Sequence, residues 1–123
     1  MWRMRPWWGL LVLAAACAPG AEPLPQQAPD IIGTVEERRE VQGGVSVLIQ
    51  QDSMRSAGYP VARVTVGSGT RVVRRAEGGL VAASAEALRV GTRVQAWFTG
   101  PVMRSYPAQA TARLVMIVPE AAP

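Results

Sequence analysis

Alternating apolar and polar residues predict five short β-strands after residue 30. Within each run the apolar side chains recur at every second position, which gives the strand one apolar and one polar face. We place the strands at 31–41, 45–50, 61–66, 93–99 and 112–118. Gly33 interrupts the first strand and predicts a bend or bulge there. After the glycines of 67–69, residues 70–73 are expected to resume the pairing of the third strand.

The last two strands predict which side chains share a face. In the strand 93–99, alternation puts Val94, Ala96 and Phe98 on one face and Trp97 on the opposite, outer face. The apolar residues expected to share a face of the final strand are Ala112, Leu114, Met116 and Val118.

A short helix is predicted between the third and fourth strands. Ser84 can cap it, residues 85–88 contain good helix formers, and Gly91 ends it. Five strands with a helix after the third is the element order of an OB-fold, a Greek-key barrel. Closing the sheet into a barrel removes its exposed edge strands. A domain of about ninety residues has few further segments with which to cover such edges. The sequence therefore predicts an all-β, OB-like barrel over residues 30–119, followed by a tail, 120–123.

The first sixteen residues have the pattern of a signal peptide. Arg3 and Arg5 precede the apolar run 7–16, which as a helix would be about 15 Å long. A bilayer core of about 30 Å needs twice that length. A basic start, a short apolar run and small residues at its end are typical of a signal peptide rather than a transmembrane helix.

The chain's one cysteine, Cys17, follows this run directly. The segment LAAAC, 13–17, resembles the lipobox of bacterial lipoproteins, in which the cysteine becomes the lipid-modified first residue of the mature protein. It departs from the usual lipobox in having Ala14, not Leu, three places before the cysteine. The alternative is ordinary secretion after cleavage at 14–16, but this would leave an unpaired thiol in an oxidising compartment. We therefore expect an extracytoplasmic envelope protein held to the membrane through lipidated Cys17.

A proline-rich linker is predicted between Cys17 and the barrel. Residues 18–29, APGAEPLPQQAP, contain four prolines and no apolar periodicity. Such a segment favours an extended polyproline spacer, with a reach of at most about 37 Å at 3.1 Å per residue.

Charge and aromatic content argue against a nucleic-acid partner. All thirteen basic residues are arginines, and without Arg3 and Arg5 eleven arginines face nine acids, a net charge of +2. OB-folds bind single strands with basic grooves and several stacking aromatics, whereas the chain after residue 17 has four aromatic residues. The cluster of Arg71, Arg74 and Arg75 is expected to be solvated surface, with contact to anionic lipid or glycan as the alternative.

Residue types do not predict catalysis, a cofactor or a metal site. The chain has no histidine, its serines lack a GxSxG context, and its single cysteine is assigned to lipidation. Glu36, Glu37 and Glu40 alternate with arginines and are expected to be solvated. The segment GSGT, 67–70, precedes a strand rather than a helix, which favours a turn over a phosphate loop.

Three segments resemble the YobA-like bacterial domain of unknown function: IIGTVEE at 31–37, LRVGTRVQAWFTG at 88–100 and SYPAQATA at 105–112. The resemblance covers roughly 30–118. It implies a compact β domain found on secreted proteins and lipoproteins, with no assigned activity and no established catalytic residues.

The candidate partner-binding residues lie in and around the connection between the last two strands, because loops on a rigid barrel concentrate binding groups. They are Trp97, Arg104, Ser105, Tyr106 and Gln109. A purely structural alternative is that Tyr106 packs against the barrel end with its hydroxyl bonded to backbone. We expect a non-enzymatic binding module for an envelope protein, peptide or glycan; the alternative is a structural or accessory subunit of an envelope assembly.

Overall fold

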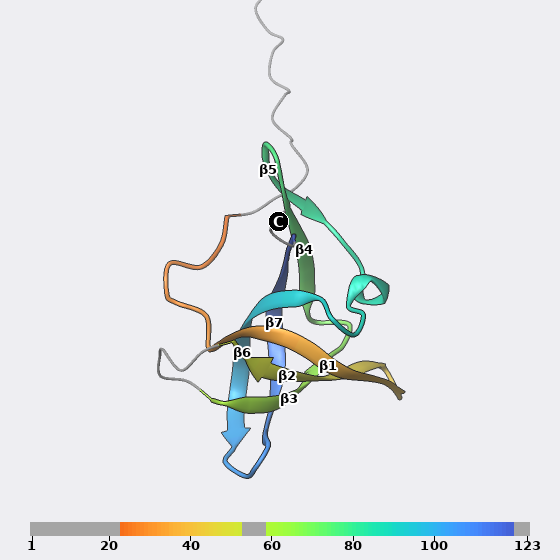
Figure 1. Cartoon of the computed structure of the whole chain (residues 1–123), viewed down its shortest axis with the longest axis vertical. Helices are drawn as coiled ribbons and strands as arrows, with labels where there is room; N and C mark the ends of the chain where they lie inside the picture. Colours follow the sequence, from red (N-terminus) through yellow and green to blue (C-terminus); the bar gives the residue numbers. More distant parts are fainter. Residues whose placement is uncertain (1–22, 53–58, 120–123) are drawn as a thin grey trace, which may run out of the picture.

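The computed structural model describes residues 23–52 and 59–119, and β-strands dominate them (Figure 1). The predicted signal peptide, Cys17 and the tail 120–123 lie outside these residues. In chain order the elements are β1 (Ile31–Val41), β2 (Gly44–Gln51), β3 (Val61–Val66), β4 (Arg71–Ala76), β5 (Gly79–Ala82), the 3₁₀ turn η1 (Ala85–Ala87), β6 (Arg93–Met103) and β7 (Ala108–Val118). None of the helical segments in the described ranges has the length and apolar character to cross a bilayer.

Five of the strands close a barrel. The antiparallel pairs run in the order β3–β2–β1–β6–β7, and a parallel contact between β3 and β7 joins the two ends of that series. In this contact Val64 lies beside Ala110. Because every barrel strand has a partner on both sides, the five-stranded barrel itself has no open edge. The prediction of an all-β fold with a closed five-stranded barrel is confirmed.

The strand β4 continues the path of β3 along β7. Strand β3 pairs with residues 108–111 of β7, and β4 pairs with 114–117, both in parallel. The resumption of pairing expected after the glycines of 67–69 is therefore present. The β4–β5 hairpin that follows was not predicted, since its β5 has little apolar alternation; Gly78 forms its turn with a φ of 96°.

A helix between the third and fourth predicted strands is not present. The segment forms only the three-residue turn η1, and Ser84 makes no side-chain cap hydrogen bond. The reason is that the chain forms hydrogen bonds with β1 only a few residues after the turn. The amide of Gly91 donates to the carbonyl oxygen of Val35 at 2.8 Å, and the amide of Val35 donates to that of Thr92 at 2.9 Å. Leu88, just after the turn, is fully buried in the barrel core.

The residues that the structure describes form two apolar clusters. The larger fills the barrel and includes Phe98, Val94 and Leu88. The smaller, here called the outer cluster, lies on the outer side of the β6–β7 sheet. Its buried members are Val73, Trp97, Leu114 and Met116, with Leu24, Leu80 and Val118 packed around them.

A bulge in β7 corrects the predicted faces of the final strand. Trp97 pairs with Leu114 while the next residue, Phe98, pairs with Ala112, so Arg113 is extra on the β7 side. The extra residue reverses the alternation. Ala112 faces the barrel interior, whereas Leu114 and Met116 belong to the outer cluster. Of the four residues expected to share a face, Leu114, Met116 and Val118 do so on the outer side, and only the placement of Ala112 with them was wrong.

Gly33 has a different role from the one predicted. The bulge in β1 falls at Glu36, between the pairs Val35–Ile49 and Glu37–Leu48. Gly33 itself is regularly paired, but a Cβ atom there would overlap the backbone carbonyl oxygen of Gln50. Close approach of two backbones, not a bend, requires glycine at this position.

Strands β6 and β7 are longer than predicted, because pairing resumes beyond the expected strand end. Gly100, with a φ of 73°, and the following proline form an irregular stretch, after which Met103 pairs with Gln109. The predicted connection between the last two strands shrinks to residues 104–107.

Candidate functional site

The β6–β7 loop, residues 104–107, projects from one end of the barrel (Figure 1). The amide of Ser105 donates to the carbonyl oxygen of Met103 at 3.0 Å, and the Ser105 hydroxyl donates to that of Pro107 at 2.8 Å. The Tyr106–Pro107 peptide bond is cis. The loop's polar groups are therefore partly satisfied within the loop itself.

Large apolar side chains on this loop face solvent. Tyr106 is 78% exposed, and Met103, at the end of β6, is 60% exposed. Arg104 between them is also exposed. The structural alternative required Tyr106 to pack against the end of the barrel. Its exposure shows that it does not.

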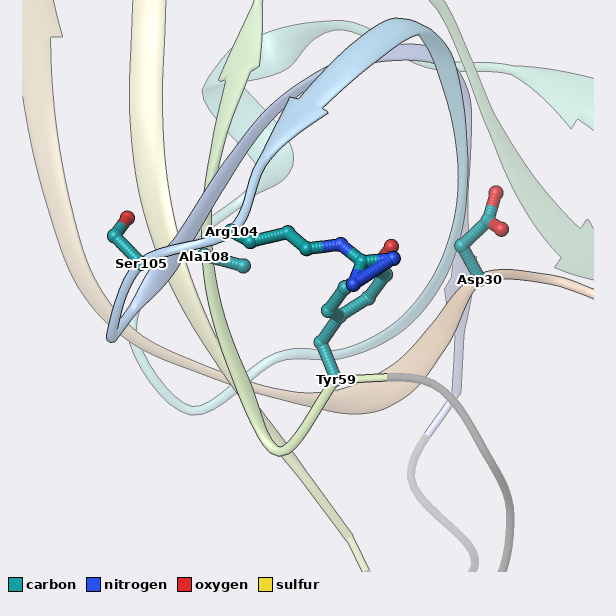
Figure 2. Close-up of a pocket in the computed structure, with 5 residues that line it drawn as sticks. All are labelled: Asp30, Tyr59, Arg104, Ser105 and Ala108. Atoms are coloured by element: carbon teal, nitrogen blue, oxygen red, sulfur yellow. The ribbon is translucent and has the colours of Figure 1, made fainter.

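An open pocket of about 590 Å³ lies beside the loop. Its lining residues are Asp30, Tyr59, Arg104, Ser105 and Ala108. Figure 2 shows the Arg104 side chain extending from the end of β6 toward Tyr59 and Asp30. The pocket thus combines a guanidinium, a phenol ring, a hydroxyl and a carboxylate around one opening.

The barrel topology explains why these residues meet. Strands β1, β3 and β7 run in one direction and β6 in the other, as their antiparallel and parallel pairings require. The starts of β1, β3 and β7 therefore lie at the same end as the finish of β6. Asp30 precedes β1, Tyr59 comes two residues before β3, and Arg104 follows β6.

Two walls of the pocket are held by the barrel. A carboxylate oxygen of Asp30 accepts a hydrogen bond from the amide of Phe98 at 2.9 Å, and the Asp30 amide donates to Ala96 at 2.8 Å. The Tyr59 ring packs against the Phe98 ring, with centroids 5.8 Å apart and planes tilted by 36°. Both side chains are positioned before any ligand arrives.

Arg104 is the group best placed to recognise a ligand. Among the residues that the structure describes, no partner atom lies within hydrogen-bond or ion-pair distance of its guanidinium. A guanidinium presents five N–H donors in a planar fork that matches carboxylates and backbone carbonyls. Next to it, the exposed face of Tyr106 offers apolar contact area with a polar tip.

Of the predicted site residues, three lie at the pocket and one, Gln109, lies on β7. Arg104 and Ser105 line the pocket, and Tyr106 stands beside it. Gln109 is exposed on β7, where its neighbours in register are Met103 on β6 and Arg63 on β3.

Trp97 lies away from this group. It is on the outer side of β6, as alternation predicted, but only 2% of its surface is exposed. Its indole nitrogen donates to the carbonyl oxygen of Gln27 at 2.9 Å. This burial removes Trp97 from the candidate partner-binding surface.

The segment that covers Trp97 is the end of the predicted linker. We call residues 23–29 the N-terminal strap. Leu24 packs against the outer cluster, and Gln27 accepts the indole hydrogen bond. This part of the proline-rich segment is fastened to the barrel, so it does not act as a free spacer.

Asp30 and Tyr59 were not among the predicted site residues. A signal for them was present in the sequence, because each comes shortly before a predicted strand. In the predicted topology the starts of the first and third strands lie at the same barrel end as the final connection. Combining topology with residue type would have placed both residues at that end.

Other charged and glycine-rich features serve structure. Arg63 pairs with Glu37 at 3.4 Å and Arg38 with Glu40 at 3.6 Å, and both carboxylates are exposed. In the GSGT segment the Thr70 hydroxyl donates to the Ala112 carbonyl at 2.6 Å, which fixes the predicted turn against β7. Within 23–52 and 59–119 no group of three or more His, Cys, Asp or Glu is arranged to hold a metal ion.

Comparison with known proteins identifies part of the chain. Residues 68–119 match the family model DUF3221, described as a protein of unknown function. No curated protein and no solved structure matches the chain significantly. The matched segment runs from the turn before β4 to the end of β7 and includes the β6–β7 loop. Its description assigns no activity, so the site has to be interpreted from its own chemistry.

Proposed function

We propose that this protein is a non-enzymatic, lipid-anchored envelope protein whose barrel binds a protein or peptide at the β6–β7 end. The observation that carries the proposal is the set of exposed side chains beside the pocket: Met103, Arg104 and Tyr106. Methionine, arginine and tyrosine are enriched in protein interfaces, and arginine and tyrosine are frequent binding hot spots.

The strand connectivity supports an OB-like Greek-key barrel as the finer fold. In the closed series β1–β2–β3–β7–β6, the first strand pairs with the fourth barrel strand and the third with the fifth. In OB-folds the loop between the fourth and fifth strands takes part in binding, and here that loop carries Arg104 and Tyr106. The YobA-like resemblance, which implies an envelope domain, is consistent with this role.

Localisation in the proposal rests on the N-terminal sequence. The signal-peptide pattern of 1–16 and the lipobox-like segment before Cys17 favour export and lipidation. Several acyl chains, at about 0.8 kcal/mol per buried methylene, make such anchoring effectively permanent.

Crosslinking in native membranes tests the binding site. A photoreactive phenylalanine analogue placed at Tyr106 is expected to form adducts with one partner protein. The same analogue at Val90, which is 63% exposed between η1 and β6, serves as the control and is expected to form none. No adduct from position 106 would contradict the proposal. Equal adducts to one protein from both positions would instead favour an accessory subunit packed into an assembly.

A truncation separates binding from folding. Because Tyr106 is largely exposed, Tyr106→Ala is expected to change the free energy of unfolding by no more than about 0.5 kcal/mol. The amount of partner protein, identified by the crosslinking experiment, that co-purifies with the variant should fall by about tenfold or more. A marked loss of thermal stability with the partner still retained would show that the residue is structural.

A further inference from the structure

The N-terminal strap joins the domain beside the β4–β5 hairpin. Leu24 packs against the outer cluster, which also contains Val73 of β4 and Leu80 of β5. The start of the described chain and the hairpin lie at one end of the molecule, and the β6–β7 loop lies at the other (Figure 1). Any anchor that precedes the strap therefore holds the domain from the hairpin end.

Fastening the strap shortens the tether. If the chain were free up to Asp30, the twelve residues 18–29 would separate the domain from Cys17, a reach of about 37 Å at 3.1 Å per residue. With Leu24 held in the outer cluster, the six residues 18–23 remain, a reach of about 19 Å at 3.1 Å per residue. The hairpin end is thus kept close to the surface in which Cys17 is anchored.

The hairpin presents uncompensated positive charge. Arg74 and Arg75 are exposed on β4, and no carboxylate of the described residues lies within ion-pair distance of either. Among the described residues, the Arg75 side chain makes one hydrogen bond, a weak one to the Met116 sulfur at 3.7 Å. Glu77, in the turn, is the single acid within 71–82. By contrast, Arg38 and Arg39 of β1 and Arg63 of β3 each lie within ion-pair distance of a glutamate of β1.

Apolar surface accompanies the charge. Val81 on β5 is 39% exposed, and its partner in register is Arg74. Arginine beside exposed aliphatic surface suits the boundary between headgroups and acyl chains, where the guanidinium stays in the polar layer.

We propose that the β4–β5 hairpin, residues 71–82, is a membrane-contact surface that binds anionic phospholipid headgroups through Arg74 and Arg75. This inference rests on the proposed lipid anchor at Cys17. Each arginine near an anionic leaflet strengthens association with the membrane by about fivefold. Two such contacts would bind a free protein only weakly, but they are sufficient for a domain that the anchor already holds within reach of the surface. Contact at this end directs the β6–β7 loop away from the membrane, toward its partner.

The test attaches the full chain chemically, so that it does not depend on lipidation by the cell. The Cys17 thiol is coupled to a maleimide lipid in vesicles of phosphatidylcholine alone, or of phosphatidylcholine with phosphatidylglycerol. Amide hydrogen exchange is then measured by peptide. Peptides that cover 71–82 are expected to exchange about fivefold more slowly when phosphatidylglycerol is present, and high salt should remove the difference.

Charge variants provide the matched comparison. Arg74→Gln with Arg75→Gln is expected to abolish the protection by phosphatidylglycerol. Arg104→Gln, which removes an exposed charge at the opposite end of the barrel, is expected to leave it intact. Equal exchange of 71–82 in the two kinds of vesicle, or protection of the β6–β7 loop instead, would overturn the proposal. Neither result would bear on whether cells lipidate Cys17, which is tested separately by fractionation.

Discussion

Adjacent residues of β6 connect two separate parts of the molecule. Phe98 faces the barrel interior and contacts Tyr59 in the pocket wall, whereas Trp97 faces outward and is buried under the strap. Both are tied to the chain that precedes β1: Asp30 accepts from the Phe98 amide, and Gln27 accepts from the Trp97 indole. At the residue scale, changes at Trp97 therefore report on the strap, and changes at Phe98 report on the pocket.

Gly33 gives a sharp residue-scale prediction. Gly33→Ala places a methyl group against the Gln50 carbonyl oxygen and is expected to destabilise the protein by about 3 kcal/mol, because two paired backbones would have to separate. Gly69→Ala is the matched control, since nothing lies within 4 Å of a Cβ there and its φ is not in the left-handed region. Denaturant unfolding of both variants measures the difference. Similar midpoints for the two would contradict the close approach.

At the scale of elements, the strap and the β4–β5 hairpin form a layer outside the barrel. Leu24 and Leu80 contribute apolar contacts from segments far apart in the chain, and Val73 and Met116 lie between them. The strap and the hairpin together cover Trp97. Without them, this large indole on the outer face of a barrel strand would remain exposed to water. The outer cluster is thus what makes the strap part of the folded domain.

Removing the strap's apolar contact should loosen this layer without opening the barrel. Leu24→Ala is expected to lower the free energy of unfolding by about 1–2 kcal/mol, in proportion to the half-buried side chain it removes. The acrylamide quenching of tryptophan fluorescence should roughly double. It is measured on the chain that starts at Cys17, in which Trp97 is the only tryptophan. Val90→Ala, at an exposed position, is the control. Unchanged quenching in Leu24→Ala would show that the strap is not held through Leu24.

At the scale of the whole molecule, the two ends of the barrel carry different chemistry. One end has the start of the strap, the β4–β5 hairpin and its exposed arginines; the other has the pocket and the β6–β7 loop (Figure 1). If the protein is tethered as proposed, this separation is an advantage, because the proposed membrane-contact surface and the proposed partner-binding surface do not compete. The proposed anchor and the proposed binding site are compatible in geometry.

Cys17→Ser tests the anchor for the whole protein. Without the thiol no acyl chain can be attached, and the protein is expected to move from the membrane fraction to the soluble fraction on cell fractionation. Cys17→Ala should behave in the same way, whereas Arg104→Gln should leave the distribution unchanged. A Cys17→Ser protein that stays with the membrane would rule out lipidation as the means of attachment.

Sequence reasoning found part of the site and missed part of it. Arg104 and Ser105 were identified because a polar connection between two strands is a local feature. Asp30 and Tyr59 were missed because each is unremarkable among its neighbours and becomes part of a site only through strand pairing. Trp97 was placed on the correct side of β6, but its cover comes from the strap, seventy residues earlier at Gln27.

The sequence by itself determined the approximate positions of the five barrel strands, the all-β class and the inner faces of β2, β3 and β6, because side-chain alternation is a property of a single strand. Only the tertiary structure decided the features that depend on a partner. The parallel contact of β3 with β7 closes the barrel and gathers the pocket, the bulge at Arg113 reverses the faces of β7, and the outer cluster fastens the strap. Each of these joins segments distant in the chain, and local alternation contains no information about which segments will meet.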